Sequence, residues 1–112
     1  MRAHPLIQMM EKRAGGIPCG IPSYCSANKL VLEAVLRRAG ETGAPVLIEA
    51  TANQVDQSGG YTGMRPRDFR RLVRQMAAEA GVAEEQLILG GDHLGPLTWQ
   101  RLPEAEAMGR AR

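Results

Sequence analysis

Two segments of the chain, residues 27–39 and 66–80, repeat apolar residues at the spacing of three and four positions that an amphipathic helix needs. The first helix is predicted to be capped by Ser26 and to stop at Gly40. The second is predicted to begin at Pro66, which suits a first helical turn. We expect both apolar stripes to face the core; they consist of Ala27, Leu30, Val31, Ala34 and Val35 in the first helix and of Phe69, Leu72, Val73, Met76, Ala77 and Ala80 in the second.

Short apolar runs predict three strands that alternate with these helices. Residues 45–50 and 86–90 are almost continuously apolar, which is typical of parallel strands buried on both faces. Residues 17–24 contain two prolines and are predicted to be extended. Weaker helical patterns at residues 5–14 and 103–112 flank this set. The order of elements predicts an α/β fold of parallel strands joined by right-handed crossovers.

Composition narrows the class of protein. The chain has 112 residues, of which 44% are hydrophobic and 23% charged, as in one globular domain and unlike a disordered chain. Only 4% of the residues are aromatic and the net charge is +2, so we expect no nucleic-acid partner. No apolar run approaches the roughly 18 residues of a membrane span, so we expect no membrane partner. Two cysteines are too few for a disulfide framework, which favours a reducing, cytoplasmic location.

Three motifs resemble one protein family. They are residues 25–27 (CSA) before an apolar helix, residues 47–55 (LIEATANQV) with 59–64 (GGYTGM), and residues 88–96 (ILGGDHLGP). In this order and spacing they closely resemble the accessory subunits of tagatose-bisphosphate aldolase. The resemblance implies a TIM-type (β/α)8 barrel, of which this chain has about three βα units. Residues 1–112 are then expected to be the N-terminal part of a single barrel domain that ends within the helix after the third strand.

The resemblance also implies a function. It implies a non-catalytic subunit that supports the stability and activity of a catalytic class II aldolase subunit in carbohydrate catabolism, on the routes of galactitol, N-acetylgalactosamine and tagatose 6-phosphate. We expect no catalysis by this chain on its own. One alternative is a metal-dependent sugar-phosphate aldolase or 4-epimerase in its own right, which needs a full set of metal ligands around His93. Another is a truncated gene product without function, because the chain stops inside a helical pattern.

Candidate chemistry follows the predicted strands, because (β/α) barrels carry their chemistry at the carboxyl ends of strands. Asp92-His93 resembles the pair of class II aldolases, which implies metal binding by His93 and proton transfer by Asp92. Alternatively, the pair satisfies backbone groups of the loop. Zinc needs about three protein ligands, so we expect no cofactor in this chain alone and divalent zinc in the full-length protein or its partner. Glu49 is the second catalytic candidate as a buried acid, against an ion pair with an arginine.

The polar loop that follows the second strand is a candidate substrate site. Glycine-rich turns can hold a phosphate with backbone N–H groups, so a sugar phosphate is a candidate ligand. The residues in question are Asn53, Gln54, Gly59 and Gly60. The favoured alternative is an ordered loop that covers a cleft or a partner.

Two further features receive structural interpretations. Five arginines could bind nucleic acid or sugar phosphates, but the spacing favours a solvated outer helix face. They are Arg65, Arg67, Arg70, Arg71 and Arg74. Cys25 could act as a nucleophile, but a buried structural thiol is favoured since no histidine lies near it in the sequence.

Overall fold

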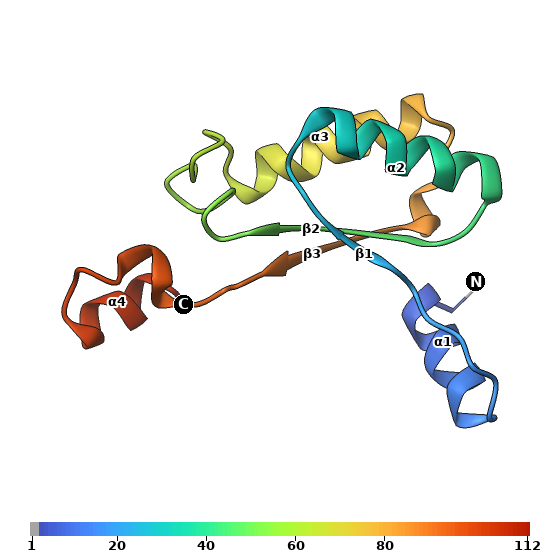
Figure 1. Ribbon diagram of the computed structural model, residues 1–112, viewed down its shortest axis with the longest axis horizontal. Coiled ribbons are helices and arrows are strands. Elements are labelled where there is room, and N and C mark those ends of the chain that lie inside the picture. The colour runs from blue at the N-terminus through green and yellow to red at the C-terminus, as the bar shows by residue number, and fades with distance from the viewer. Residues whose placement is uncertain (1–2) are drawn as a thin grey trace.

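The structure, a computed structural model, describes residues 3–112 and contains a three-stranded parallel sheet with two helices packed on one face (Figure 1). The strands are β1 (Ser23–Cys25), β2 (Val46–Thr51) and β3 (Leu87–Asp92). The helices are α1 (Pro5–Ala14), α2 (Lys29–Thr42), α3 (Pro66–Glu79) and α4 (Glu104–Arg110), with short 3₁₀ turns η1 (Glu84–Gln86) and η2 (Pro96–Trp99). The predicted α/β class, the element order and the parallel strands are therefore confirmed.

The sheet has two different faces. β2 is central, and its Glu49 pairs with Cys25 on β1 and with Gly90 on β3. Side chains alternate between the faces of a strand. On β2 the outer face is buried and carries Val46, Ile48 and Ala50, whereas the inner face is half-buried and carries Leu47, Glu49 and Thr51. The prediction of a strand buried on both faces is wrong for β2, because α2 and α3 cover only the outer face.

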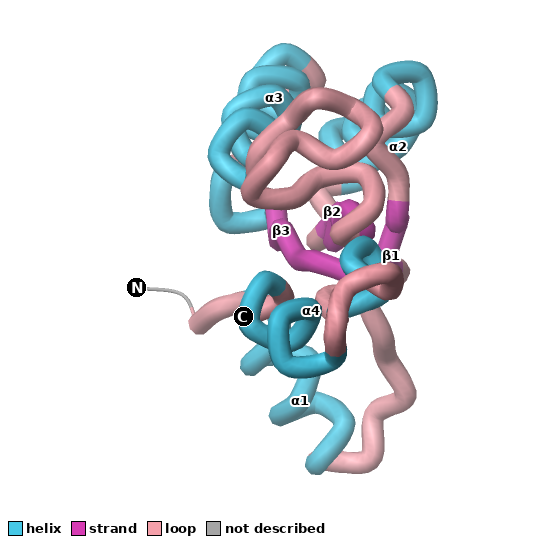
Figure 2. The backbone as a smooth tube through the Cα atoms, turned by 90° about the vertical axis from the view of Figure 1, so that its left-hand side faces the viewer, coloured by secondary structure: helices cyan, strands magenta, loops and turns pink. Residues whose placement is uncertain are grey.

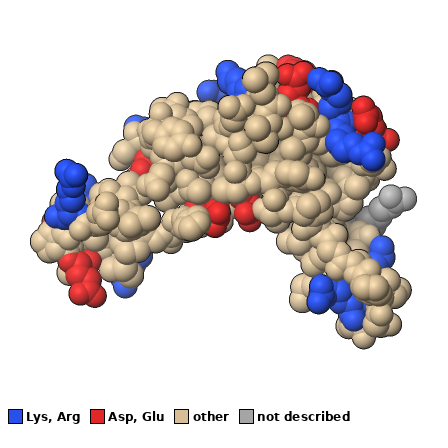
Figure 3. Space-filling model, in the orientation of Figure 1, with Lys and Arg blue, Asp and Glu red and all other residues tan. Residues whose placement is uncertain are grey.

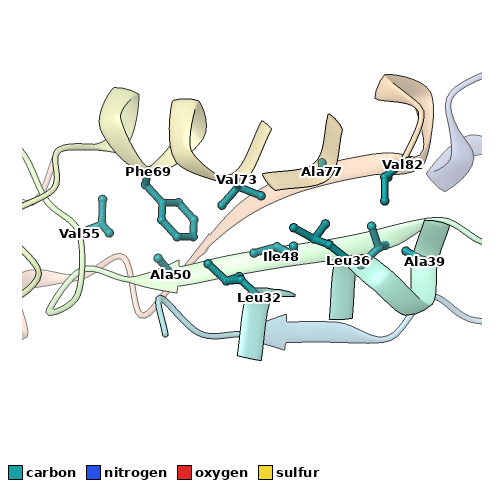
Figure 4. Packing of buried hydrophobic residues seen from close by; sticks show 11 residues of the cluster. Leu32, Leu36, Ala39, Ile48, Ala50, Val55, Phe69, Val73, Ala77 and Val82 are labelled. Atoms are coloured by element: carbon teal, nitrogen blue, oxygen red, sulfur yellow. The ribbon is translucent and has the colours of Figure 1, made fainter. Parts of the chain in front are cut away.

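One apolar core joins the sheet to α2 and α3 (Figure 4). Its fully buried side chains are Leu32 and Leu36 from α2, Ile48 from β2 and Val73 from α3. Full burial of a side chain of this size contributes roughly 1.5–3 kcal/mol. These contacts fix both helices over the outer face and leave the inner face to carry polar groups.

Helix α2 presents a different face to the core from the one that its pattern predicts. Its buried residues are Leu32, Leu36 and Ala39. Leu30 and Val31, which were expected to be core residues, are 77% and 43% exposed. The expected residues and the buried residues both have helical spacing. The residues that pack on the sheet are the ones that include Leu32 and Leu36. The predicted stripe is therefore wrong for Leu30 and Val31, whereas its Ala27 and Val35 are half-buried against the core.

Both ends of α2 also differ from the prediction. The N-cap is Asn28, whose Oδ1 accepts hydrogen bonds from the N–H groups of Leu30 at 2.9 Å and Val31 at 3.3 Å. The helix continues through Gly40 and ends at Gly43, which has the left-handed φ of 69°. At Gly40 an added Cβ would overlap the carbonyl oxygen of Ala80. Gly40 thus allows the close approach of α2 to the end of α3.

Helix α3 follows its prediction closely. It begins at Pro66, and the Asp68 carboxylate accepts a hydrogen bond from the Arg65 N–H at 3.1 Å. Phe69, Val73 and Ala77 are buried. Such a first-turn acid also complements the helix dipole. A single apolar stripe, a cap and a proline all indicate the same orientation here.

The segments outside this α/β layer form two arms. Helix α1 and the η2–α4 segment lie on the inner side of the sheet, at its two opposite ends (Figures 1 and 2). The radius of gyration is 16.1 Å, against about 13 Å for a compact domain of this length. The arms therefore frame the inner face of the sheet rather than covering it.

Candidate functional site

Polar side chains from all three strands meet on the inner face near the carboxyl ends. We call Ser23, Cys25, Glu49 and Asp92 the inner-face group. The pairing of Cys25 with Glu49 and of Thr51 with Asp92 brings these side chains to one region of the sheet. Figure 3 shows acidic side chains at the middle of the concave side, between the two arms. The group therefore combines two carboxylates with a hydroxyl and a thiol.

Glu49 is held in place by its two neighbouring strands. The Ser23 hydroxyl donates a hydrogen bond to Glu49 Oε2 at 2.7 Å. On the other side, an added Cβ at Gly90 would lie 3.1 Å from both Cγ and Oε1 of Glu49. Because Gly90 has no side chain, the Glu49 side chain can lie close over its backbone. Within residues 3–112, no ion pair involves Glu49, so the hydroxyl of Ser23 stands where the sequence suggested an arginine.

Cys25 is exposed, so the prediction of a buried structural thiol is wrong for this residue. Partial desolvation raises the pKa of its thiol, and a hydrogen bond to the Asp92 carboxylate and the negative charges of Asp92 and Glu49 raise it further. A raised pKa keeps the sulfur protonated at neutral pH. The surroundings of the thiol therefore disfavour an activated, thiolate nucleophile.

Asp92 and His93 make two close contacts with each other. The backbone N–H of His93 donates a hydrogen bond to Asp92 Oδ1 at 2.8 Å. The ring atom Nε2 of His93 lies 3.7 Å from Asp92 Oδ2. His93 has the left-handed φ of 51°, which is uncommon for a residue with a Cβ. The structure thus brings Asp92 into the inner-face group, while His93 lies exposed at its margin.

The residues of this segment do not fit a zinc site by themselves. In the part of the chain that the structure describes, no group of three or more His, Cys, Asp and Glu residues is placed to hold a metal ion. The other histidine, His4, caps α1, where its Nδ1 accepts a hydrogen bond from the Leu6 N–H at 3.3 Å. A catalytic zinc needs about three protein ligands, so Asp92 and His93 alone do not complete such a site.

The polar groups of the loop after β2 form hydrogen bonds with other groups of the protein. Gln54 Oε1 accepts a hydrogen bond from the Thr51 N–H at 2.8 Å, and Asn53 Oδ1 accepts one from the Thr98 hydroxyl at 3.1 Å. The N–H groups of Gly59 and Gly60 donate to the carbonyl oxygen and to Oδ1 of Asp56. A substrate role for these four residues stays a prediction, because in this structure the groups named here bond to β2, to the loop itself or to η2.

Sequence reasoning missed two residues of this region. Asp56 is buried, and its Oδ1 also accepts a hydrogen bond from the Ser58 N–H at 2.7 Å. The sequence signal was an aspartate followed by Ser and Gly, which is typical of a turn that the side chain stabilises. Ser23, the partner of Glu49, had no local signal, because their contact depends on the pairing of β1 with β2.

The arginines lie on the exposed side of α3, while Phe69 and Val73 face the core, as the sequence analysis favoured. Arg71 pairs with Asp68 at 3.4 Å, and Arg74 pairs with Glu84.

Residues 6–112 match the family model described as D-tagatose-1,6-bisphosphate aldolase subunit GatZ/KbaZ-like. The chain belongs to this family. The suspected relationship to tagatose-bisphosphate aldolase subunits is therefore confirmed.

A solved structure supports the fold. This chain is similar to a crystal structure described as a probable tagatose 6 phosphate kinase from Sinorhizobium meliloti 1021, at 57% sequence identity and a TM-score of 0.78. The similarity covers 83% of this chain and 24% of the solved chain. This chain thus corresponds to about a quarter of the length of that relative. In the described residues, no helix combines the length and the apolar character that crossing a membrane requires.

Proposed function

We propose that this GatZ/KbaZ-like chain acts as a non-catalytic subunit of a class II tagatose-1,6-bisphosphate aldolase and supports the stability and activity of a catalytic subunit. The observation that carries the proposal is the family match over residues 6–112, since the family is described as an aldolase subunit. The resemblance of the motifs implies the supporting role. The zinc ligands and the proton-transfer group then belong to the catalytic subunit.

The proposal includes the architecture. In a TIM-type barrel each strand is followed by a helix outside the barrel, and the inner face of the sheet lines the centre. The outer α2 and α3 are consistent with two such units, β1–α2 and β2–α3, whereas α4, which follows β3, lies on the inner side of the sheet. In that setting the inner-face group would line the mouth of the barrel. Its carboxylates accept hydrogen bonds, so its expected ligand is a hydroxyl-rich sugar phosphate held through its hydroxyl groups.

Co-expression with a catalytic class II subunit tests the supporting role. We expect the chain alone to cleave no tagatose 1,6-bisphosphate in a coupled assay with added zinc, and the pair to cleave it faster and to survive heating longer than the catalytic subunit alone. Unchanged activity and half-life of the catalytic subunit would contradict the proposal. Turnover by the chain alone, above that of a His93→Ala control, would replace it by an enzymatic role.

A second candidate function rests on the position of Asp92. It is a carboxylate at a strand end beside Cys25 and Glu49, where an aldolase or 4-epimerase acting by retro-aldol chemistry places its proton-transfer group. If the chain is such an enzyme, Asp92→Asn should lower its rate by about 10²–10⁴-fold.

The same samples should be assayed for ATP-dependent phosphorylation of tagatose 6-phosphate, because the solved relative carries a kinase description.

A further inference from the structure

The helix layer on the outer face of the sheet does not fully cover β3. On β2 the three side chains of this face are buried. On β3 the same face carries Leu87 and Leu89, which pair with outer residues of β2 and are only half-buried. Among the described residues, α2 and α3 are the helices on this side of the sheet (Figure 1). The outer face of β3 is therefore left partly open beside α3.

Arginines of α3 border this open part of β3. Arg74 pairs with Glu84, which lies three residues before β3, so this flank of α3 is turned toward β3. Arg67 and Arg70 lie on the same flank, because they precede Arg74 by seven and four positions. No ion pair of residues 3–112 involves Arg67 or Arg70, and both line a shallow hollow of about 520 Å³. We use the name α3–β3 surface for Arg67, Arg70, Leu87 and Leu89.

One side of helix α4 has the complementary features. Met108 is 41% exposed, and the exposed Ala105 and Glu104 precede it by three and four positions, so the three residues share one side of the helix. Within residues 3–112, Glu104 makes no ion pair, whereas Glu106 pairs with Arg110 on the opposite side of α4. This side of α4 therefore combines apolar side chains with an unpaired carboxylate, as the α3–β3 surface combines leucines with unpaired arginines.

The order of the elements also favours α4 as the occupant. A right-handed crossover from β3 would place the following helix on the outer face, beside α3 and parallel to it. The first turn of α4 would then lie beside the first turn of α3, which brings Glu104 to Arg67 and Arg70. The connection is long enough, because residues 93–95 and 100–103 span up to about 23 Å when extended, against roughly 8–10 Å between neighbouring helices.

Few contacts hold α4 on the inner side of the sheet. It packs mainly on η2, and its one buried residue is Ala107. The Thr98 hydroxyl donates a hydrogen bond to Asn53 Oδ1 at 3.1 Å, and Gln57 Nε2 donates one to the Arg110 carbonyl oxygen at 2.7 Å. Both bonds join exposed groups, so water can replace them at small cost in free energy. The η2–α4 segment can therefore leave this position without disrupting the core.

We propose that the α3–β3 surface is a second binding position for α4 of the same chain, and that the η2–α4 segment moves between the inner and the outer position. In the outer position the apolar side of α4 covers the leucines of β3, and Glu104 meets Arg67 and Arg70. Apolar burial stabilises this position, and the charges align the helix, since exposed ion pairs contribute little. The movement clears the inner side at the carboxyl ends of the strands, beside the inner-face group. The inference concerns the chain by itself and does not depend on the proposed function.

Disulfide formation between introduced cysteines distinguishes the two positions, in a chain whose native cysteines are both changed to serine. Arg74→Cys with Met108→Cys reports the outer position, because these residues lie one turn beyond the expected contact of Arg70 with Glu104. Asn53→Cys with Thr98→Cys reports the inner position, where the two side chains are in contact. We expect both pairs to form intramolecular disulfides under mild oxidation, followed by mass spectrometry of tryptic peptides.

Two controls separate specific binding of α4 from random collision. Arg74→Cys with Glu106→Cys is the matched pair, since Glu106 lies on the opposite side of α4 from Met108. It should form its disulfide at least about tenfold more slowly than the outer pair. Glu104→Gln, added to the outer pair, should slow its disulfide by up to about fivefold at low salt. At about 1 M salt this effect should disappear, because the charges are screened.

Three results would overturn the inference. The first is an outer pair that stays reduced while the inner pair oxidises, and the second is an outer pair that reacts no faster than its matched control. The third is a disulfide-linked dimer of the outer pair, which would assign the α3–β3 surface to α4 of a second copy. The unchanged chain gives an independent measurement, because the outer position predicts nuclear Overhauser effects between the methyl groups of Met108 and Leu89. Their absence would contradict the outer position without any substitution. Circular dichroism spectra confirm that each variant is folded.

Discussion

The close approach of two helices at Gly40 gives the sharpest prediction for stability. In a solvated helix interior, Gly to Ala stabilises by about 1 kcal/mol, because alanine restricts the unfolded chain and glycine does not. Gly40 lies inside α2 but not in a solvated position. An added Cβ would overlap the Ala80 carbonyl oxygen and lie 3.2 Å from its carbon. We therefore expect Gly40→Ala to destabilise the protein despite its favourable helix propensity.

The magnitude follows from the atoms involved. The obstacle is backbone at the end of α3, so no flexible side chain can move aside. The two helices must separate until the Cβ has an ordinary contact distance of 3.4–4 Å. That movement loosens the packing of the adjoining core residues Leu36 and Ala39. Overpacking of this kind costs about 1–3 kcal/mol, so after the propensity gain of about 1 kcal/mol we expect a net loss of up to about 2 kcal/mol.

Urea unfolding followed by far-ultraviolet circular dichroism measures this difference. With a typical dependence on denaturant of about 2 kcal/mol per molar urea for a small protein, the midpoint for Gly40→Ala should fall by up to about 1 M. Gly109→Ala is the matched control: Gly109 lies in α4, and no atom stands within 4 Å of its added Cβ. It should leave the midpoint unchanged or raise it. A Gly40→Ala protein that is as stable as the Gly109→Ala protein would refute the argument for close helix contact.

Three further changes test single contacts. Asn28→Ala removes the cap of α2 and should lower the free energy of unfolding by about 1 kcal/mol in thermal or urea melts; an unchanged stability would mean that the cap contributes nothing. Gly60→Ala, where both the φ of 56° and backbone contacts oppose a Cβ, should destabilise more than Gly63→Ala, where only the φ of 77° does, and the reverse order would contradict the loop geometry. Asp92→Asn removes an acceptor and a charge that raise the pKa of the Cys25 thiol. Iodoacetamide should therefore modify Cys25 faster in this variant at a given pH, and an equal rate would remove Asp92 as a cause.

How far the sequence predicts the fold differs between the two core helices. α3 has one apolar stripe and strongly polar remaining positions, so its periodicity determines its orientation. α2 has apolar residues on opposite sides, with Leu30 on one and Leu32 and Leu36 on the other. Periodicity detects a helix in both cases but cannot choose between two apolar faces. The choice depends on packing against the sheet, which is a tertiary property.

The candidate site shows the same division between local and long-range information. Asp92 and Glu49 were predictable as carboxylates at strand ends, and the structure places both on the inner face. The exposure of Cys25 and the hydrogen bond from Ser23 were not predictable. Both depend on which residues of β1 lie beside β2, and this register is set by contacts between segments that are distant in the sequence.

The two sides of the α/β layer share no side-chain contacts at Leu30 and Glu49. The inner-face group and the exposed Leu30 of α2 lie on opposite sides of one layer, with β2 and the core between them. A substitution at Leu30 removes no contact of the packed core, and Glu49 takes its hydrogen bond from Ser23 on the other side. Substitutions this far apart without shared partners usually have additive effects. The changes in the free energy of unfolding that Leu30→Ser and Glu49→Gln cause should therefore add in the double variant, measured by urea unfolding. A double variant that departs from the sum by more than about 0.5 kcal/mol would mean that the two sides of the layer are coupled.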